Sequence, residues 1–210
     1  KTQVVICPSF PALFPMADML KDTMLNVGAQ TCSAYAHGAY TGQVSAQSIK
    51  QAGACFCIVG HSETRHYYNQ FPEEIGAQVA RLLEQDIHPI ICLGETQEEH
   101  TEKETCAVLE EQLNGVLPAL IESNQPFTIA YEPVWAIGSG ESAKPEEIAA
   151  IFSWLSEQIK QHIDHEQWRL IYGGSVDPEN VQKLKKVPLL SGFLIGSAST
   201  DFQKLQKIVL

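Results

Sequence analysis

The sequence predicts an α/β protein built around a parallel sheet. Segments of strand type alternate with segments of helical spacing along the 210 residues. The strand segments are apolar throughout, as expected for strands that helices cover on both faces. Two architectures satisfy this pattern, a doubly wound open sheet and a closed barrel of eight β/α units. We count seven strands, whereas a closed barrel has eight and about 250 residues.

Each predicted strand is a short run of aliphatic or β-branched residues. The stretch CFCIV at Cys55 to Val59 is the clearest, because it has no polar position and so fits a fully buried strand. The seven runs are Val4 to Cys7, Leu25 to Gln30, Cys55 to Val59, His88 to Cys92, Phe127 to Tyr131, Arg169 to Tyr172 and Gly192 to Ile195.

Apolar residues at helical spacing predict the connecting helices. The helix that begins at Pro145 is the best marked, because proline suits a first turn and Glu146 and Glu147 lie beside the positive end of the helix dipole. The other helices are predicted at Pro11 to Lys21, Ser45 to Gln51, Glu73 to Gln85, along the acidic segment that carries Val108 to Leu117, at Pro178 to Lys186, and after Gly196.

Composition limits the possible partners and compartment. With 44% hydrophobic residues, we expect one globular domain over residues 1–210. A net charge of -11 argues against nucleic acid and anionic membrane as partners. No apolar run approaches the roughly 20 residues of a membrane helix and the first residues given show no cleavable signal pattern, so we expect neither membrane insertion nor secretion. Six cysteines without metal-type spacing favour a reducing, cytoplasmic compartment and no metal site.

Two candidate chemical groups follow strand ends, where both α/β architectures place their ligands. His61 comes directly after the CFCIVG strand, and Glu132 ends the FTIAY strand before an apolar loop with glycines. Taken alone, a histidine at the position of His61 is more often a structural hydrogen-bonding group. A lone glutamate at the position of Glu132 is more often a surface residue before a turn. The longer strings around them decide between these readings.

The strings GHSETR, which begins at Gly60, and FTIAYEPVWAIGSG, which begins at Phe127, resemble two motifs of the triosephosphate isomerase family. The resemblance implies a (β/α)8 TIM barrel, an enzyme that interconverts dihydroxyacetone phosphate and D-glyceraldehyde 3-phosphate through an enediolate, and no cofactor. Glu132 would be the base, and His61 the electrophile. Ser62 and Glu63 would be its neighbours, and Arg65 a supporting cation.

The same resemblance gives His61 its protonation state. A histidine at a helix N-terminus faces the positive end of the dipole, which disfavours imidazolium and lowers the pKa. A neutral imidazole can then donate a hydrogen bond to a carbonyl, an arrangement for which this family is itself a standard illustration. The apolar residues after Glu132, Val134 to Ile137, would form a lid that excludes water.

Glycine-bearing turns after the last strands resemble the family's phosphate site. Gly138, Ser175, Gly196 and Ser197 would contact the substrate phosphate through backbone N–H groups and a helix N-terminus. Ser197 stands where the family has a second glycine, and a left-handed backbone there would cost serine on the order of 1 kcal/mol.

The polar connection Thr31 to Gln43 resembles the family's third loop, which inserts into a neighbouring subunit. A homodimer is therefore implied, with Thr41 at the contact. Tyr40 and Gln43 replace the more usual Phe and Glu of that loop.

The resemblance starts at the family's second strand. The first strand, with its Asn and its substrate-neutralising Lys, has no counterpart in the 210 residues. We therefore expect that a first β/α unit of the natural protein precedes them, and that the chain is inactive without that lysine. Two other functions remain open: a barrel acting on a different sugar phosphate, and a catalytically silent phosphate-binding barrel.

Overall fold

The computed structural model describes residues 2–137 and 142–209. The chain divides into two compact units. The first comprises Lys1–Ile91 and Leu113–Phe127, and the second comprises Cys92–Gln112 and Thr128–Leu210. The expectation of one domain over residues 1–210 stays a prediction, and each unit is described by itself.

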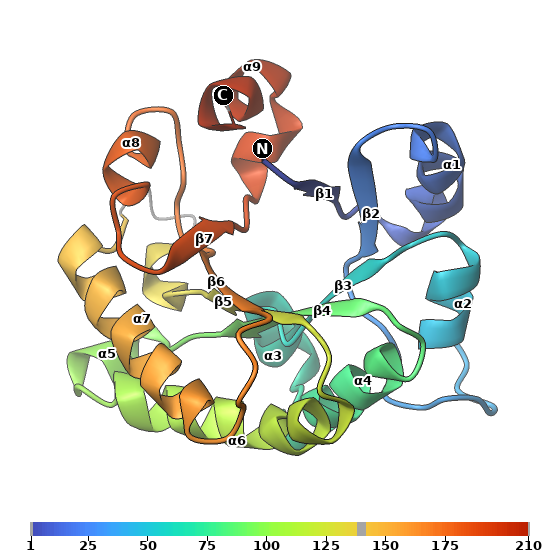
Figure 1. Cartoon of the computed structure of the whole chain (residues 1–210), viewed down its shortest axis with the longest axis horizontal. Helices are drawn as coiled ribbons and strands as arrows, with labels where there is room; N and C mark the ends of the chain where they lie inside the picture. Colours follow the sequence, from blue (N-terminus) through green and yellow to red (C-terminus); the bar gives the residue numbers. More distant parts are fainter. Residues whose placement is uncertain (1, 138–141, 210) are drawn as a thin grey trace. The chain divides into compact units, whose positions relative to one another are not determined.

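Within residues 2–137 and 142–209, seven strands form the sheet, in the same order as in the chain (Figure 1). They are β1 (Val4–Ile6), β2 (Leu25–Ala29), β3 (Phe56–Val59), β4 (His88–Leu93), β5 (Phe127–Tyr131), β6 (Trp168–Tyr172) and β7 (Leu190–Phe193). The predicted number of strands and the α/β class are confirmed. β5 is buried at all five positions, which explains why its sequence has no polar face.

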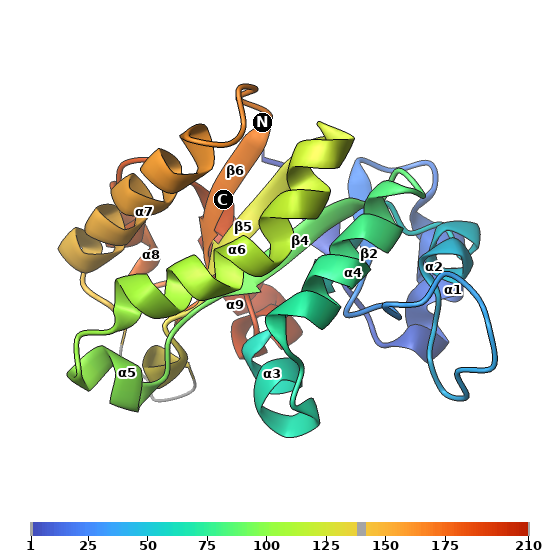
Figure 2. The same ribbon diagram turned by 90° about the horizontal axis from the view of Figure 1, so that it is seen from below.

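In the first unit, β1, β2, β3 and β4 pair in parallel. Gly28 leaves little room for a side chain in β2, because a Cβ there would lie 2.7 Å from the Cys7 sulfur and 3.2 Å from the Phe56 carbonyl oxygen. The helices of this unit are α1 (Phe10–Leu20), α2 (Ala46–Gln51), α3 (Ser62–Tyr68), α4 (Pro72–Leu83) and the later part of α6 (Thr105–Ser123). Figure 2 shows α2 lying beside α4.

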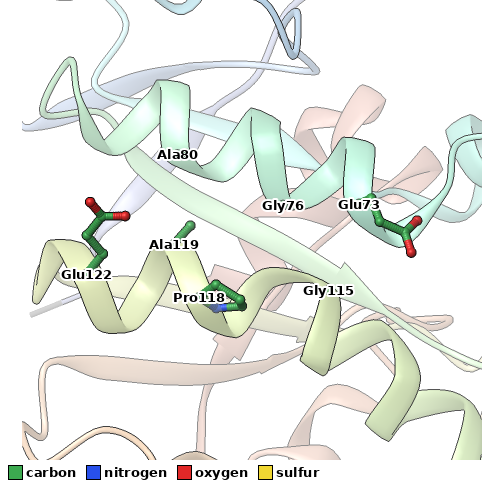
Figure 3. A pocket seen from close by; sticks show the side chains of 7 residues that line it. All are labelled: Glu73, Gly76, Ala80, Gly115, Pro118, Ala119 and Glu122. Carbon is green, nitrogen blue, oxygen red and sulfur yellow. The ribbon is translucent and has the colours of Figure 1, made fainter.

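Helices α4 and α6 approach each other closely in the first unit (Figure 3). A Cβ on Gly76 would fall on the carbonyl oxygen of Gly115, so only glycine permits this backbone contact. A groove of about 350 Å³ runs along the two helices. Its lining is Glu73, Gly76, Ala80, Gly115, Pro118, Ala119 and Glu122, and it includes none of the predicted site residues.

In the second unit, backbone hydrogen bonds join the strand ends. The Glu132 nitrogen donates to the Leu93 oxygen at 2.8 Å, the Gly173 nitrogen to the Tyr131 oxygen at 2.8 Å, and the Leu194 nitrogen to the Tyr172 oxygen at 2.9 Å. The helices are α5 (Gln97–Thr101), η1 (Val134–Ala136), α7 (Pro145–Lys160), α8 (Val181–Leu184), η2 (Ser197–Thr200) and α9 (Phe202–Val209), together with the start of α6.

Helix α7 begins as its sequence predicts. Pro145 occupies the first turn, and the Glu147 carboxylate accepts a hydrogen bond from the Lys144 nitrogen at 3.1 Å. The apolar stripe of the helix, which includes Ile148, Phe152, Leu155 and Ile159, is buried. Burial of this stripe fixes the helix on the unit more strongly than helix propensity does.

Three sequence-based predictions were wrong in detail. Strict alternation fails, because β3 is followed by α3 and α4, and β4 by α5 and α6. The helix predicted at Pro178 to Lys186 is shorter, since Asp177 Oδ1 accepts hydrogen bonds from the nitrogens of Glu179 and Asn180 and holds that segment as a turn. The strand predicted at Gly192 to Ile195 is β7 (Leu190–Phe193), which begins directly after Leu189 at a φ of 64°.

Over the described parts of the chain, every helix is too short or too polar to cross a lipid bilayer.

Candidate active site

His61 lies between the end of β3 and the start of α3, in the first unit. The chain turns there at Gly60, which has a φ of 66°, and His61 is the N-cap residue of α3. Its side chain is 28% exposed. The Glu63 backbone nitrogen donates to Nδ1 of His61 at 3.3 Å, and a Glu63 carboxylate oxygen lies 3.8 Å from the same nitrogen.

This cap selects a tautomer. An Nδ1 that accepts a backbone hydrogen bond carries no proton, so a neutral His61 has its proton on Nε2. Nε2–H is then available as a donor. The expected role of a neutral imidazole as a hydrogen-bond donor is chemically compatible with this local geometry.

The other predicted residues around His61 hold its turn in place. Ser62 opens α3 and Glu63 lies in its first turn. Arg65 folds back, so that its Nε donates to the Gly60 oxygen at 2.8 Å. The Thr64 hydroxyl donates to the His61 oxygen at 2.8 Å. His61 and the four residues after it therefore lie together at one strand end in the first unit.

Glu132 lies at the end of β5 in the second unit and is only 2% exposed. Its backbone is fixed to β4 through the Leu93 oxygen. Two glycines make room for it: a Cβ on Gly94 would fall on the Glu132 carbonyl oxygen, and a Cβ on Gly173 would lie 2.8 Å from Glu132 Cγ. The carboxylate is thus held in a narrow, pre-formed place, as a positioned base requires.

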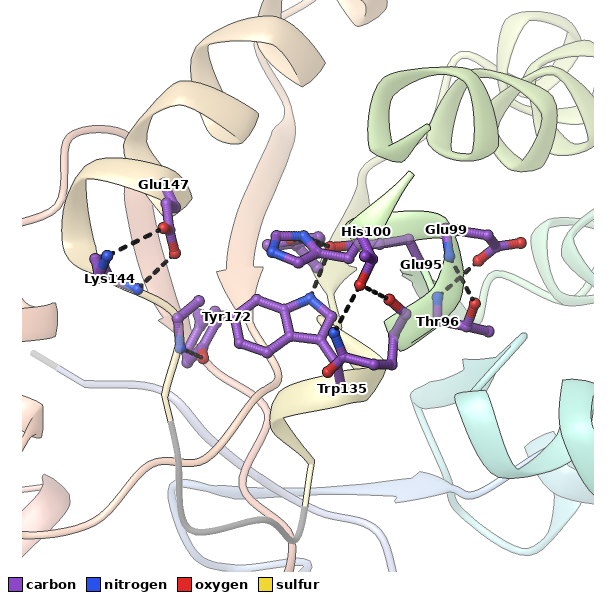
Figure 4. Close-up of polar contacts among 12 residues, drawn as sticks. Glu95, Thr96, Glu99, His100, Trp135, Lys144, Glu147 and Tyr172 are labelled. Atoms are coloured by element: carbon purple, nitrogen blue, oxygen red, sulfur yellow. Dashed lines mark hydrogen bonds and ion pairs between the residues drawn. The ribbon is translucent and has the colours of Figure 1, made fainter. Parts of the chain in front are cut away.

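A second buried carboxylate, Glu95, anchors the segment after Glu132 (Figure 4). Glu95 is 0% exposed, and its Oε1 accepts hydrogen bonds from the Tyr131 hydroxyl at 3.0 Å and from Trp135 Nε1 at 2.9 Å. The Val134 nitrogen donates to the Glu95 backbone oxygen at 3.0 Å. Sequence reasoning missed Glu95, although its place in the LGET string directly after β4 was a usable signal.

Two tyrosines in this unit have raised pKa values. Burial raises the pKa of Tyr131 well above its ordinary range, and the neighbouring Glu95 carboxylate adds to the shift. Burial also raises the pKa of Tyr172 to about 12, although the hydrogen bond from the Ala143 nitrogen opposes this. Both phenols therefore stay protonated at neutral pH and can act as hydrogen-bond partners.

The predicted phosphate contacts follow β6 and β7. The Ser175 hydroxyl donates to the Ala136 oxygen at 2.7 Å, which joins the turn after β6 to the segment after Glu132. Gly196 precedes η2, and Ser197 is its first residue. Ser197 has no left-handed backbone, so the conformational cost considered for it does not arise. Gly138 lies outside the described residues.

Comparison with known proteins gives one consistent result. The family model for triosephosphate isomerase matches residues 1–210. A triosephosphate isomerase from Aquifex aeolicus is 37% identical over 209 residues, which is 99% of this chain and 85% of that protein. The relative from Protochlamydia amoebophila is 38% identical over 211 residues, covering 99% of this chain and 80% of its own length.

Comparison with solved structures leads to the same family. The crystal structure of triosephosphate isomerase from Bartonella henselae has a TM-score of 0.90 and 33% sequence identity, over 98% of this chain and 85% of that one. This similarity confirms the predicted TIM-barrel fold. The chain therefore belongs to the triosephosphate isomerase family.

Proposed function

We propose that this protein catalyses the interconversion of dihydroxyacetone phosphate and D-glyceraldehyde 3-phosphate, with Glu132 as the base and His61 as the electrophile. The observation that carries the proposal is Glu132 itself. It is a buried carboxylate at a strand end, fixed by its own backbone and enclosed by two glycines, in a chain that belongs to an isomerase family.

The reaction moves one proton between adjacent carbons. The Glu132 carboxylate removes a proton from the carbon next to the carbonyl, which leaves an enediolate, and then returns the proton to the neighbouring carbon. Nε2–H of a neutral His61 donates a hydrogen bond to the carbonyl oxygen and to the negative charge that develops there. One carboxylate and one neutral histidine suffice for this proton transfer, so we propose that the step needs no metal and no cofactor.

The substrate phosphate would bind through backbone N–H groups after β6 and β7. Ser175, Gly196 and Ser197 are the described candidates, and Gly138 is the fourth predicted contact. Backbone N–H groups and a helix N-terminus form anion-binding sites of this kind. Because the chain has a net charge of -11, an anionic substrate can bind only where the local potential is positive, as it is beside these N–H groups.

The deciding experiment is steady-state kinetics in both directions on three variants. Glu132→Asp shortens the base and Glu132→Gln removes it, so we expect kcat to fall about 10²- to 10⁴-fold for the second. Glu122→Gln, at an exposed carboxylate of α6, is the matched control and should keep wild-type kinetics. An unchanged kcat in Glu132→Gln would contradict the assignment. Phosphate binding without any turnover would instead indicate a catalytically silent barrel.

We also propose that the protein is a cytoplasmic homodimer and that the loop at residues 31–43 makes the subunit contact. The start of this loop is held by a buried hydrogen bond: Gln78 Nε2 donates to the Cys32 oxygen at 2.6 Å. Its tip is exposed, with Tyr35 and Tyr40 stacked at a ring distance of 3.7 Å and Thr41 at the surface. Thr41→Glu should shift the protein to monomers in sedimentation experiments, whereas Ser48→Glu on α2 should not.

A further inference from the structure

The imidazole of His100 packs against the tryptophan that follows Glu132. His100 belongs to α5, and its ring stacks on Trp135 with 4.5 Å between centroids and 29° between planes. Its Nδ1 lies 3.3 Å from Oε1 of Glu95, the oxygen that also receives the Trp135 indole N–H. His100, Trp135 and Glu95 therefore form one cluster in the second unit (Figure 4).

Glu95 has an unbalanced charge when His100 is neutral. The carboxylate is fully buried, and its two hydrogen-bond donors, the Tyr131 hydroxyl and the Trp135 indole, are both neutral. Its second oxygen, Oε2, is buried and has no hydrogen-bond partner. Burying a charged carboxylate without a cation lowers the stability of the folded state, and a nearby cation reduces this free-energy cost. Protonated His100 supplies such a cation.

Among the described residues, Glu95 is the ionisable group in contact with this imidazole. Glu95, which follows β4, lies beside the imidazole. Tyr131, at the end of β5, donates its hydroxyl hydrogen bond to the same Glu95 oxygen. Helix η1 contributes Val134, Trp135 and Ala136, none of which titrates. On its own helix, the Glu99 carboxylate is occupied by the Thr96 nitrogen at the helix N-terminus, and Gln97, Glu98 and Thr101 complete α5. Within the described residues, no lysine or arginine is paired with Glu95.

The cluster is connected to Glu132 by short backbone links. Trp135 is three residues after Glu132, and the segment between them is bound to the end of β4 at two points: the Glu132 nitrogen to the Leu93 oxygen, and the Val134 nitrogen to the Glu95 oxygen. The Trp135 indole adds a third point at the Glu95 carboxylate. Any change in how firmly Trp135 is held therefore reaches the backbone that carries Glu132.

We propose that His100 is a positioning residue for Glu132, and that protonation of its imidazole holds Trp135 and the segment that carries Glu132 more firmly against Glu95. A falling pH favours the protonated imidazole, so this hold strengthens as the pH falls. The inference rests on the proposed function for its catalytic consequence only, because the pH-dependent state of Trp135 exists whether or not the protein is an isomerase.

The direct test is ¹⁹F NMR on the full chain labelled with 5-fluorotryptophan. The chain has three tryptophans, and Trp135→Phe identifies the Trp135 signal by its loss. In the wild type, we expect this signal to move along a single titration curve as the pH is lowered. In His100→Gln the curve should be absent. His162→Gln, which changes an exposed histidine of the same unit, should leave the curve intact.

A second variant separates charge from packing. His100→Arg keeps a planar cation that stacks on indole and pairs with a carboxylate at all pH values used. Its Trp135 signal should be independent of pH and lie near the acid end of the wild-type curve. A Trp135 signal that titrates equally in wild type and His100→Gln overturns the proposal, as does one that does not titrate in the wild type.

Kinetics measure the catalytic consequence. The ratio of wild-type kcat to His100→Gln kcat should be about 2- to 5-fold larger at pH 6 than at pH 8, the effect of one partly exposed ion pair. KM should be the same in both, because His100 is not among the proposed substrate contacts. A titrating Trp135 signal with a constant kcat ratio would refute the catalytic part of the inference, and inactivity of every variant with a normal NMR titration would refute only the proposed function.

Discussion

The turn that carries His61 and the segment that carries Glu132 are held in opposite ways. His61 is positioned by its own neighbours in sequence: Glu63 and Thr64 hydrogen-bond to it, and Arg65 bonds to Gly60. Glu132 is positioned by residues far along the chain, among them Leu93, Gly94 and Gly173. The histidine side chain is 28% exposed, whereas the glutamate is 2% exposed.

The difference indicates that distant substitutions affect the positions of His61 and Glu132 unequally. A local turn keeps its geometry as long as its own few residues are intact. A buried carboxylate fixed by several strands depends on packing throughout the second unit. We therefore expect distant substitutions to affect Glu132 strongly and His61 weakly.

The largest expected effect is that of Gly94→Ala. The new methyl group would collide with the Glu132 carbonyl oxygen, and backbone cannot yield as a flexible side chain can, so we expect a loss of about 3 kcal/mol or more in the free energy of unfolding. Urea unfolding followed by circular dichroism measures it. Gly192→Ala is the matched control, because its Cβ would only touch Ile171 at 3.4 Å. Equal stability of the two variants would show that the Glu132 segment is not rigidly held.

Tyr131→Phe should have the next largest effect. It removes one of the two neutral donors to the buried Glu95 carboxylate, which costs about 1–3 kcal/mol. The same unfolding experiment checks this, with Tyr67→Phe at a position 71% exposed as the control. A loss no larger than that of the control would argue against Glu95 as an anchor.

Alkaline pH should weaken the second unit through Tyr172. Its pKa is raised to about 12, above the ordinary value of 10.0, so the folded state keeps its proton when the unfolded state loses it. This contribution is complete below pH 10 and declines as the pH rises from 10 towards 12. Tyr172→Phe should therefore show a shallower loss of stability with pH above 10. Tyr68→Phe, at an exposed position, should keep the wild-type slope.

The smallest effect is expected for Thr64→Val, which removes the hydroxyl that bonds to the His61 oxygen. We expect at most about 1 kcal/mol in unfolding free energy, because two backbone N–H groups still donate to the same oxygen. Its kcat should stay within about threefold of the wild type. A loss of kcat as large as that for Glu132→Gln would show that the His61 turn is not self-sufficient.

Sequence periodicity predicted most elements because burial follows it directly. The β5 run Phe127–Tyr131 and the apolar stripe of α7 were found at their observed places. Periodicity did not mark the short helices α3 and α5, because five to seven residues carry too little of it. Only the family resemblance implied a helix N-terminus at His61. Their N-termini are fixed instead by individual caps at His61 and Thr96.

By itself, the sequence determined the α/β class, the seven strands, and the placing of His61 and Glu132 at strand ends, since these follow from local patterns of apolar and polar residues. Only the tertiary structure decided that Glu95 is a buried anchor, that His100 stacks on Trp135, and that Gly94 and Gly173 must be glycine. These properties depend on contacts between residues distant in sequence. The local sequence around a residue does not specify which distant residues it contacts in the folded protein.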